Sequence, residues 1–368
     1  MQMRFLLVAV FVGVISCSPR GELVYAPDHT THIRQVFVGS TRGLDPETGA
    51  AFGITRSETL QRARFDVSVP PNHTAGQLHY PLEGRKVDPQ KDFLVAGSQK
   101  YPDATAFQTE LRRSLKESGG EAVVFVHGFN NTFAEGLYRL AQMGEDFDLP
   151  KTLVYYAWPS RGHVLGYAYD RDSAIFARDG LRETLRELDR AGAKRILLVG
   201  HSMGSSVTME TLRDITLSDE TEILSHLAGV MLISPDIDVD MFREQARTIG
   251  HLPQPFVIFT SQKDKALRLS SRIAGERDRL GTLQDISRVA DLKVTMIDTA
   301  AFSTDDGHFN VASNPALIRM LGRTGQLAKI LEGEQSGKGN LATGVVLSVQ
   351  DATRIVLSPI TALGGGTN

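Results

Sequence analysis

Cysteine is nearly absent from this chain of 368 residues, which contains only one, Cys17. A single cysteine excludes an intramolecular disulfide and any zinc site built on CxxC or on paired Cys and His ligands. The motifs HExxH and DxDxDG are missing as well. No metal site and no cofactor are therefore expected.

An excess of charge of one sign is also missing. Lys plus Arg number 40 and Asp plus Glu 43, which gives a formal net charge of −3. Binding to a phosphate backbone needs an excess of basic side chains, so nucleic acid is not an expected partner. Apolar residues make up 41% of the chain, which is enough to bury a sizeable core.

The apolar run at residues 5–15 (FLLVAVFVGVI) is too short to cross a membrane. It has eleven residues, whereas a spanning helix needs about 20. Arg4 stands directly before it and supplies a short positive region. The pattern is typical of a secretory signal rather than of a membrane span.

Cys17 ends the stretch Val14-Ile15-Ser16-Cys17, which resembles the bacterial lipobox. In that motif the cysteine becomes the acylated first residue of the mature protein, so residues 1–17 are expected to be a lipoprotein-type signal peptide. Cys17 would anchor the chain to a membrane of the bacterial cell envelope without spanning it. Ser18 follows instead of Asp, which by enterobacterial sorting rules favours the outer membrane. The alternative is an ordinary signal peptide cleaved near Ser16, leaving a soluble periplasmic or secreted protein.

Short apolar segments rich in β-branched residues alternate with segments of helical spacing through the chain. Among the latter, residues 173–191 predict one helix with Ser173 as its N-cap. Continuous apolar strands between helices favour an α/β fold with an eight-stranded, mostly parallel sheet covered by helices on both faces. The first two strands are expected to form an antiparallel edge. The expected strands are 33–39, 64–70, 122–126, 153–158, 196–199, 227–234, 256–260 and 292–298.

We expect one folded domain after the signal peptide. Residues 18–118 would supply the N-terminal strands and a segment, 71–118, that wraps the sheet or shapes the pocket. Residues 119–333 would form the core. Residues 334–368 are rich in Gly, Ser and Thr and predict a partly mobile tail, in which 345–355 could form a docking helix.

The pentapeptide Gly200-His201-Ser202-Met203-Gly204 is a G-x-S-x-G motif between an expected strand and a helical stretch. A serine on such a tight strand-to-helix turn has its Oγ clear of the backbone, and the new helix points free N–H groups at it. Ser202 is therefore the expected nucleophile. The alternative is a glycine-rich turn with a solvent-facing serine.

A nucleophilic serine needs a general base, and three histidines follow Ser202. His308 lies in Asp306-Gly307-His308-Phe309, just beyond the last expected strand and before a final helix, and is the expected base. His226 precedes a strand and His251 precedes Leu252-Pro253, which are less suitable positions.

Several aspartates compete for the role of the acid that orients the base. Asp264 follows the strand 256–260 by a short turn and is the expected residue. Asp236 follows the preceding strand and is the alternative. Each of these residues could instead cap a helix or form a turn. The other competing aspartates are Asp238, Asp298, Asp305 and Asp306.

Two backbone N–H groups are expected to form an oxyanion hole. One belongs to Met203, the residue after the nucleophile, and the other to Phe129 in the loop 127–131 (HGFNN). His127 is expected to orient this loop, and Asn130 either contacts substrate or caps the next helix.

The order strand–HGFNN, strand–YAWPSRG, strand–GHSMG, strand–SQKD and strand–DGH resembles the α/β-hydrolase superfamily over residues 122 to about 332. The segments 36–42 (VFVGSTR), 67–73 (VSVPPNH), 156–162 (YAWPSRG) and 169–174 (YDRDSA) resemble a bacterial branch of serine esterases first catalogued as a domain of unknown function. The resemblance implies an α/β-hydrolase fold and cofactor-free hydrolase chemistry. It puts residues 158–174 at the rim of the site.

At that rim Tyr167, Tyr169 and Arg171 either contact substrate or form a packed, hydrogen-bonded loop. Relatives that bind long acyl chains often insert a cap between the strands that here end at 234 and begin near 255, and only 20 residues separate these. Without a large cap insertion, the expected function is a carboxylesterase for small or medium esters. The alternatives are an acyltransferase or thioesterase with the same triad, and a non-catalytic surface binding protein with a hydrolase fold.

Overall fold

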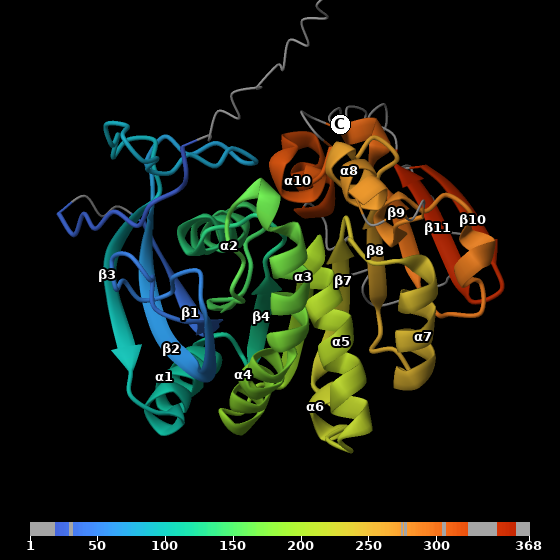
Figure 1. The fold of residues 1–368 in the computed structure, drawn as a ribbon, viewed down its shortest axis with the longest axis horizontal. Coiled ribbons are helices and arrows are strands. Elements are labelled where there is room, and N and C mark those ends of the chain that lie inside the picture. The colour runs from blue at the N-terminus through green and yellow to red at the C-terminus, as the bar shows by residue number, and fades with distance from the viewer. Residues whose placement is uncertain are drawn as a thin grey trace, which may run out of the picture.

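The computed structural model describes residues 19–28, 32–273, 275, 278–303, 307–322 and 344–357 (Figure 1). Cys17 and the expected signal peptide lie outside these ranges. In this part of the chain, every helix is too short or too polar to span a bilayer.

One sheet runs through the molecule, and six parallel strands form its centre. These are β4 (Glu121–Val126), β5 (Thr152–Ala157), β6 (Arg195–His201), β7 (Leu227–Ile233), β8 (Phe256–Thr260) and β9 (Thr295–Asp298). Each overlaps an expected strand, and β8 has the expected bounds. Alternate side chains face opposite layers: in β4, Val124 packs into one core and Phe125 into the other. Such two-sided burial explains why these strands are continuous apolar runs.

Two strands continue the parallel set, β1 (His32–Arg42) beside β5 and β11 (Ala352–Leu357) beside β9. Antiparallel pairing follows at both edges of the sheet: β2 (Arg56–Val69) runs antiparallel to β1 and to β3 (Leu94–Tyr101), and β10 (Gly344–Val349) runs antiparallel to β11. The order across the sheet is β10-β11-β9-β8-β7-β6-β4-β5-β1-β2-β3. The sheet therefore has 11 strands, and the expected number of eight was wrong.

The three additional strands lie in segments that were not expected to form strands. Residues 71–118 contain β3 and a helix besides turns, and Val95 of β3 is fully buried. Residues 345–355 form most of a hairpin, not a docking helix, because β-branched residues flank a turn in which Gln350 has a φ of 51°. Ala352 and Leu357 bury their side chains as β11 pairs with β9.

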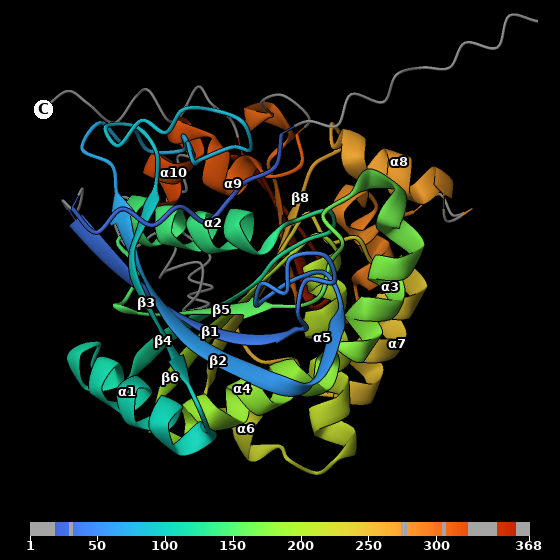
Figure 2. The same ribbon diagram turned by 60° about the vertical axis from the view of Figure 1, so that its left-hand side comes forward.

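Helices cover both faces of the sheet (Figure 2). The helices α2, α9 and α10 lie on one face, whereas α1, α4, α5 and α7 share the core on the other. The longer helices are α1 (Ala104–Glu117), α2 (Phe133–Asp146), α3 (Tyr167–Phe176), α4 (Arg178–Arg190), α5 (Met203–Leu217), α7 (Val239–Ile249), α8 (Lys265–Ile273) and α10 (Pro315–Gly322). The short ones are α6 (Glu222–Ser225), α9 (Asn310–Ser313), η1 (Val164–Gly166), η2 (Leu280–Thr282), η3 (Ile286–Val289) and η4 (Ala300–Phe302).

The helix expected at 173–191 is two helices, α3 and α4, separated at Ala177. The hydroxyl of Tyr156 donates a hydrogen bond to the Ala177 carbonyl at the junction. Ser173 is not an N-cap but lies inside α3, where its hydroxyl accepts a hydrogen bond from Arg56 Nε at 3.0 Å. A partner from another part of the chain therefore fixes each of these positions.

Candidate active site

Ser202 lies at the tight turn between β6 and α5, with φ 51° and ψ −121°. This left-handed conformation is costly for a residue with a side chain. Its N–H donates to the carbonyl of Ile233 at 2.9 Å, and its carbonyl accepts from the N–H of Ser205 at 3.0 Å. A Cβ on Gly204 would lie 2.3 Å from the Val126 carbonyl oxygen, so only glycine lets the turn pack this closely against β4.

His308 and Asp264 are brought together from segments 44 residues apart. Nδ1 of His308 lies 2.8 Å from Oδ2 of Asp264, whose side chain is fully buried. The His308 ring centroid lies 4.8 Å from that of His201, the residue before Ser202. The pair of His308 and Asp264 is therefore held at the Ser202 turn. A proton on Nδ1 of His308 leaves the lone pair of the imidazole on Nε2.

The other candidate acids have partners of their own. Asp236 accepts hydrogen bonds from Ser270 at 2.5 Å and Tyr167 at 3.1 Å and forms an ion pair with Arg279 at 3.3 Å. Asp238 caps α7, and Asp298 pairs with Arg354 at 2.6 Å. Asp305 and Asp306 lie outside the described residues. Of the described aspartates, Asp264 is the one whose carboxylate contacts His308.

The loop 127–131 packs directly on the Ser202 turn. A Cβ on Gly128 would lie 2.8 Å from the Cβ of Ser202, so the backbone approaches the serine as closely as glycine allows. Met203 is the first residue of α5, and its N–H therefore has no acceptor within the helix. The ring of Phe129 packs edge-on against Tyr167 with centroids 5.3 Å apart. The backbone segments of the two expected oxyanion donors thus both reach Ser202, one through Gly128 and the other through Met203.

His127 is buried and fastens the loop to the end of β5. Its ring stacks on that of Trp158 with centroids 4.8 Å apart, and the indole N–H donates to the His127 carbonyl at 2.6 Å. Burial, assisted by the positive charge of Arg42, lowers the pKa of His127 to about 3. The ring is therefore neutral at physiological pH, in agreement with a structural position.

Arg42 holds the same loop and Asp170 holds the neighbouring segment 160–161, and the sequence did not single out either residue. Arg42 is 1% exposed and donates to the carbonyls of Asn131 at 2.9 Å and Ser160 at 3.1 Å. Asp170 accepts from the Ser160 hydroxyl at 2.6 Å and the Arg161 N–H at 2.8 Å. The available signal was that both residues fall within segments that carry the family resemblance, 36–42 and 169–174.

The tyrosines at the rim are engaged with protein. Tyr167 donates to Asp236, and Tyr169 donates to the Ile54 carbonyl at 3.1 Å while its ring lies 4.3 Å from the guanidinium of Arg161. These contacts favour the packed, hydrogen-bonded loop over direct substrate binding. Arg171 is exposed on α3.

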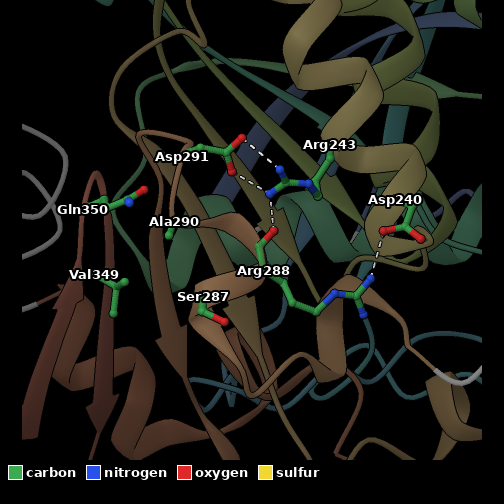
Figure 3. Close-up of a pocket in the computed structure, with 8 residues that line it drawn as sticks. All are labelled: Asp240, Arg243, Ser287, Arg288, Ala290, Asp291, Val349 and Gln350. Atoms are coloured by element: carbon green, nitrogen blue, oxygen red, sulfur yellow. Dashed lines mark hydrogen bonds and ion pairs between the residues drawn. The ribbon is translucent and has the colours of Figure 1, made fainter.

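A cavity of about 440 Å³ lies elsewhere, between α7, η3 and the β10–β11 turn (Figure 3). Its charges neutralise one another: Arg243 pairs with Asp291 at 2.6 Å, and Arg288 pairs with Asp240 at 2.9 Å. The cavity therefore presents no unpaired charge to a ligand. Across the described ranges, no group of three or more His, Cys, Asp or Glu side chains could hold a metal ion.

Residues 103–324 match the family model described as "alpha/beta hydrolase of unknown function (DUF900)", which covers more than half of the chain. No curated protein sequence matches the chain. Two similar solved structures, both at 13% sequence identity, are Aspergillus fumigatus lipase B and a lipase-esterase related protein from Clostridium acetobutylicum.

The similarity to the fungal lipase has a TM-score of 0.30 and covers 44% of this chain and 43% of that one. The similarity to the clostridial protein has a TM-score of 0.24 and covers 55% of this chain and 81% of that one. The chain thus spans less than half the length of the fungal lipase, and the assignment rests on the family match. The protein belongs to this alpha/beta hydrolase family of unknown function.

Proposed function

We propose that the protein is a serine hydrolase, and specifically a carboxylesterase that cleaves small or medium esters through an acyl-serine intermediate. The contact between His308 and a buried Asp264, held at the strained Ser202 turn, carries this proposal. A nucleophile on a strand-to-helix turn, a histidine and an orienting carboxylate constitute the machinery of acyl transfer.

In this mechanism Ser202 Oγ attacks the ester carbonyl while Nε2 of His308 takes its proton. Asp264 keeps the proton of the neutral ring on Nδ1 and stabilises the imidazolium that forms. The imidazolium then protonates the departing alcohol, which leaves the acyl group on Ser202. Water activated by the same histidine hydrolyses the acyl-enzyme and regenerates the free serine.

The N–H groups of Phe129 and Met203 would bind the negative charge that develops on the carbonyl oxygen. Their backbone is fixed before substrate arrives, because Gly128 packs against Ser202 and Met203 begins α5. Donors fixed in this way stabilise the transition state without reorganising during the reaction.

The short connection between β7 and β8 supports a preference for small or medium esters. It contains α7 and its flanking turns, and α7 packs against α5 beside the sheet. No cap domain is inserted there among the described residues. An uncapped site suits small or medium esters better than long acyl chains.

We also propose that the mature chain is anchored to the bacterial envelope through a lipid on Cys17, with the outer membrane as its location. The lipobox-like stretch that ends at Cys17 supports this. A soluble periplasmic form is the alternative, and the mass of the mature N-terminus distinguishes the two.

Labelling with a fluorophosphonate tests the proposed nucleophile, with turnover of a short-chain nitrophenyl ester measured in parallel. We expect the wild type to label and turn over and Ser202→Ala to do neither. Ser206→Ala, on the next turn of α5, is the matched control and should retain both activities. A folded wild type that neither labels nor turns over would contradict the proposal and favour a binding protein with this fold. Preferential transfer of the acyl group to an acceptor other than water would favour an acyltransferase.

A further inference from the structure

Helix α8 leaves an apolar face uncovered at the rim of the candidate site. It begins directly after Asp264, whose Oδ1 accepts a hydrogen bond from the Leu267 N–H at 2.9 Å. Leu267 and Ser270 are buried against the protein, whereas Leu269 and Ile273 are 59% and 58% exposed. Residues four apart lie on the same side of a helix, so these two side chains form one exposed apolar strip.

The same face of α8 is basic. Lys265, Arg268 and Arg272 are exposed, and the helix sequence KALRLSSRI contains no acidic residue. Arg268 donates to the Gln262 carbonyl at 2.7 Å, and an arginine bonded to a neutral carbonyl keeps its full charge. A short helix face that combines exposed Leu and Ile with Lys and Arg is typical of segments that lie on an anionic bilayer surface.

A second exposed apolar pair lies next to this face. In η1, Val164 is 54% exposed and Leu165 is 74% exposed. Tyr167, which follows η1, has its hydroxyl 3.1 Å from the hydroxyl of Ser270 on α8. Figure 2 shows the beginning of α3 beside α8, so η1, which directly precedes α3, lies near α8.

The chain enters the described structure at the end of the sheet where the parallel strands finish, the end at which α8 also begins. Arg20 donates to the Asn130 carbonyl at 2.7 Å and forms an ion pair with Glu135 at 2.6 Å. Asn130 lies in the loop that follows β4, and α8 likewise follows the end of β8, which is parallel to β4 within the sheet. Two residues, Ser18 and Pro19, separate Cys17 from Arg20, and the three Cα-to-Cα steps can span at most about 11 Å. A lipid on Cys17 therefore brings this end of the sheet close to the bilayer.

We propose that the exposed face of α8, together with Val164 and Leu165, is a docking surface for an anionic bilayer that turns the mouth of the site toward the membrane. This inference rests on the anchoring through Cys17 proposed above. A lipid alone tethers the chain without orienting it. The basic and apolar side chains of α8 supply the second contact that fixes the orientation.

The chain allows a direct test, because Cys17 is its sole cysteine and acylation would consume the thiol. A cysteine introduced at Ile273 is then a unique site for an environment-sensitive fluorophore in the full chain, purified in detergent and reconstituted into vesicles. Leu217→Cys is the matched control. Leu217 is 61% exposed and ends α5, at the end of the sheet where the parallel strands begin.

On vesicles that contain phosphatidylglycerol, we expect the label at position 273 to shift to shorter wavelength and to be protected about 10-fold from iodide quenching. The label at position 217 should show neither effect. Arg268→Glu with Arg272→Glu should abolish most of the protection, because each basic residue near an anionic surface contributes about five-fold in binding. The control pair Arg112→Glu with Arg113→Glu, on α1, should leave it intact. Equal quenching at 273 and 217 would overturn the proposal.

Failure of the docking surface can be told apart from failure of the proposed function. Turnover of a soluble nitrophenyl ester reports catalysis without a membrane, and we expect the α8 variants to retain it. Mass measurement of the mature N-terminus reports acylation of Cys17 separately. If the chain is not acylated, Cys17→Ser keeps position 273 as the one labelled thiol, and quenching with vesicles added to the protein still decides whether α8 contacts the bilayer.

Discussion

Replacement of Asp264 by Asn tests the proposed orientation of His308 most directly. Oδ2 of Asp264 contacts Nδ1 of His308 at 2.8 Å, and Oδ1 accepts from the Leu267 N–H at 2.9 Å. Asn has one oxygen, and the Leu267 N–H requires it. The amide NH₂ group then faces Nδ1, which must accept a hydrogen bond instead of donating one.

The proton of the neutral ring consequently moves to Nε2, where it prevents His308 from taking the serine proton. A tautomer error of this kind costs about 10⁴ in kcat in a serine triad, which is about 5 kcal/mol of transition-state stabilisation. The side chain stays the same size and keeps its cap on α8, so the fold should be retained. We expect the loss in initial rates of nitrophenyl ester hydrolysis and in the rate of fluorophosphonate labelling.

Asp236→Asn is the matched control. It removes the charge that pairs with Arg279, and both side chains are buried. Breaking a buried pair typically lowers the free energy of unfolding by about 3–5 kcal/mol, whereas kcat of the folded protein should stay within about 10-fold of the wild type because Asp236 does not contact His308. Thermal unfolding separates the two effects. A folded Asp236→Asn variant that loses about 10⁴ in kcat, or an Asp264→Asn variant with wild-type kcat, would show that Asp264 does not orient His308.

Three further predictions concern the loop 127–131. Gly128→Ala would bring a Cβ to 2.8 Å from that of Ser202 and displace the loop. We therefore expect kcat to fall by about 10²–10³. A variant with wild-type kcat would show that the loop does not position an oxyanion donor. Trp158→Phe keeps the stacking on His127 but leaves the His127 carbonyl without the indole N–H, which should lower the free energy of unfolding by about 1–3 kcal/mol in urea titrations. Burial lowers the pKa of His127 to about 3, so the unfolded chain binds a proton below about pH 6.5 that the folded chain does not. The free energy of unfolding should therefore fall as the pH is lowered from 6.5 towards 3, with His127 contributing up to about 1.4 kcal/mol per pH unit. In His127→Gln the free energy of unfolding should decline less steeply between pH 6.5 and 5.

The sequence predicts the central sheet and the location of the candidate site because both depend on local patterns. Strands buried on two faces are short apolar runs bounded by turn residues, and β8 begins and ends where it is expected. The Ser202 turn is specified by small residues within one pentapeptide. His308 and Asp264 each follow a strand, and the carboxyl ends of parallel strands meet at one edge of the sheet.

The edges of the sheet are less predictable, because their strands gain stability from partners distant in sequence. β11 pairs with β9 across 58 residues, from Thr295 to Thr353, and Arg354 is fixed there by Asp298 at 2.6 Å. In β3, exposed residues follow buried Leu94 and Val95, so the apolar pattern is too short to identify. The apolar pattern within a short segment carries no information on these long-range contacts.

The contacts that hold the loop 127–131 show why a reactive site depends on residues far from it in sequence. Asn130 has a φ of 57° and the segment lies between β4 and α2, so neither strand nor helix hydrogen bonds fix its backbone. Arg42 supplies that rigidity from 89 residues away. Burial of its guanidinium costs free energy, and the cost is offset only while carbonyls of the loop and of its neighbour, including that of Ser160, accept its hydrogen bonds. A displaced loop would leave a buried charge unsatisfied, so Arg42 stabilises the arrangement in which Gly128 packs against Ser202.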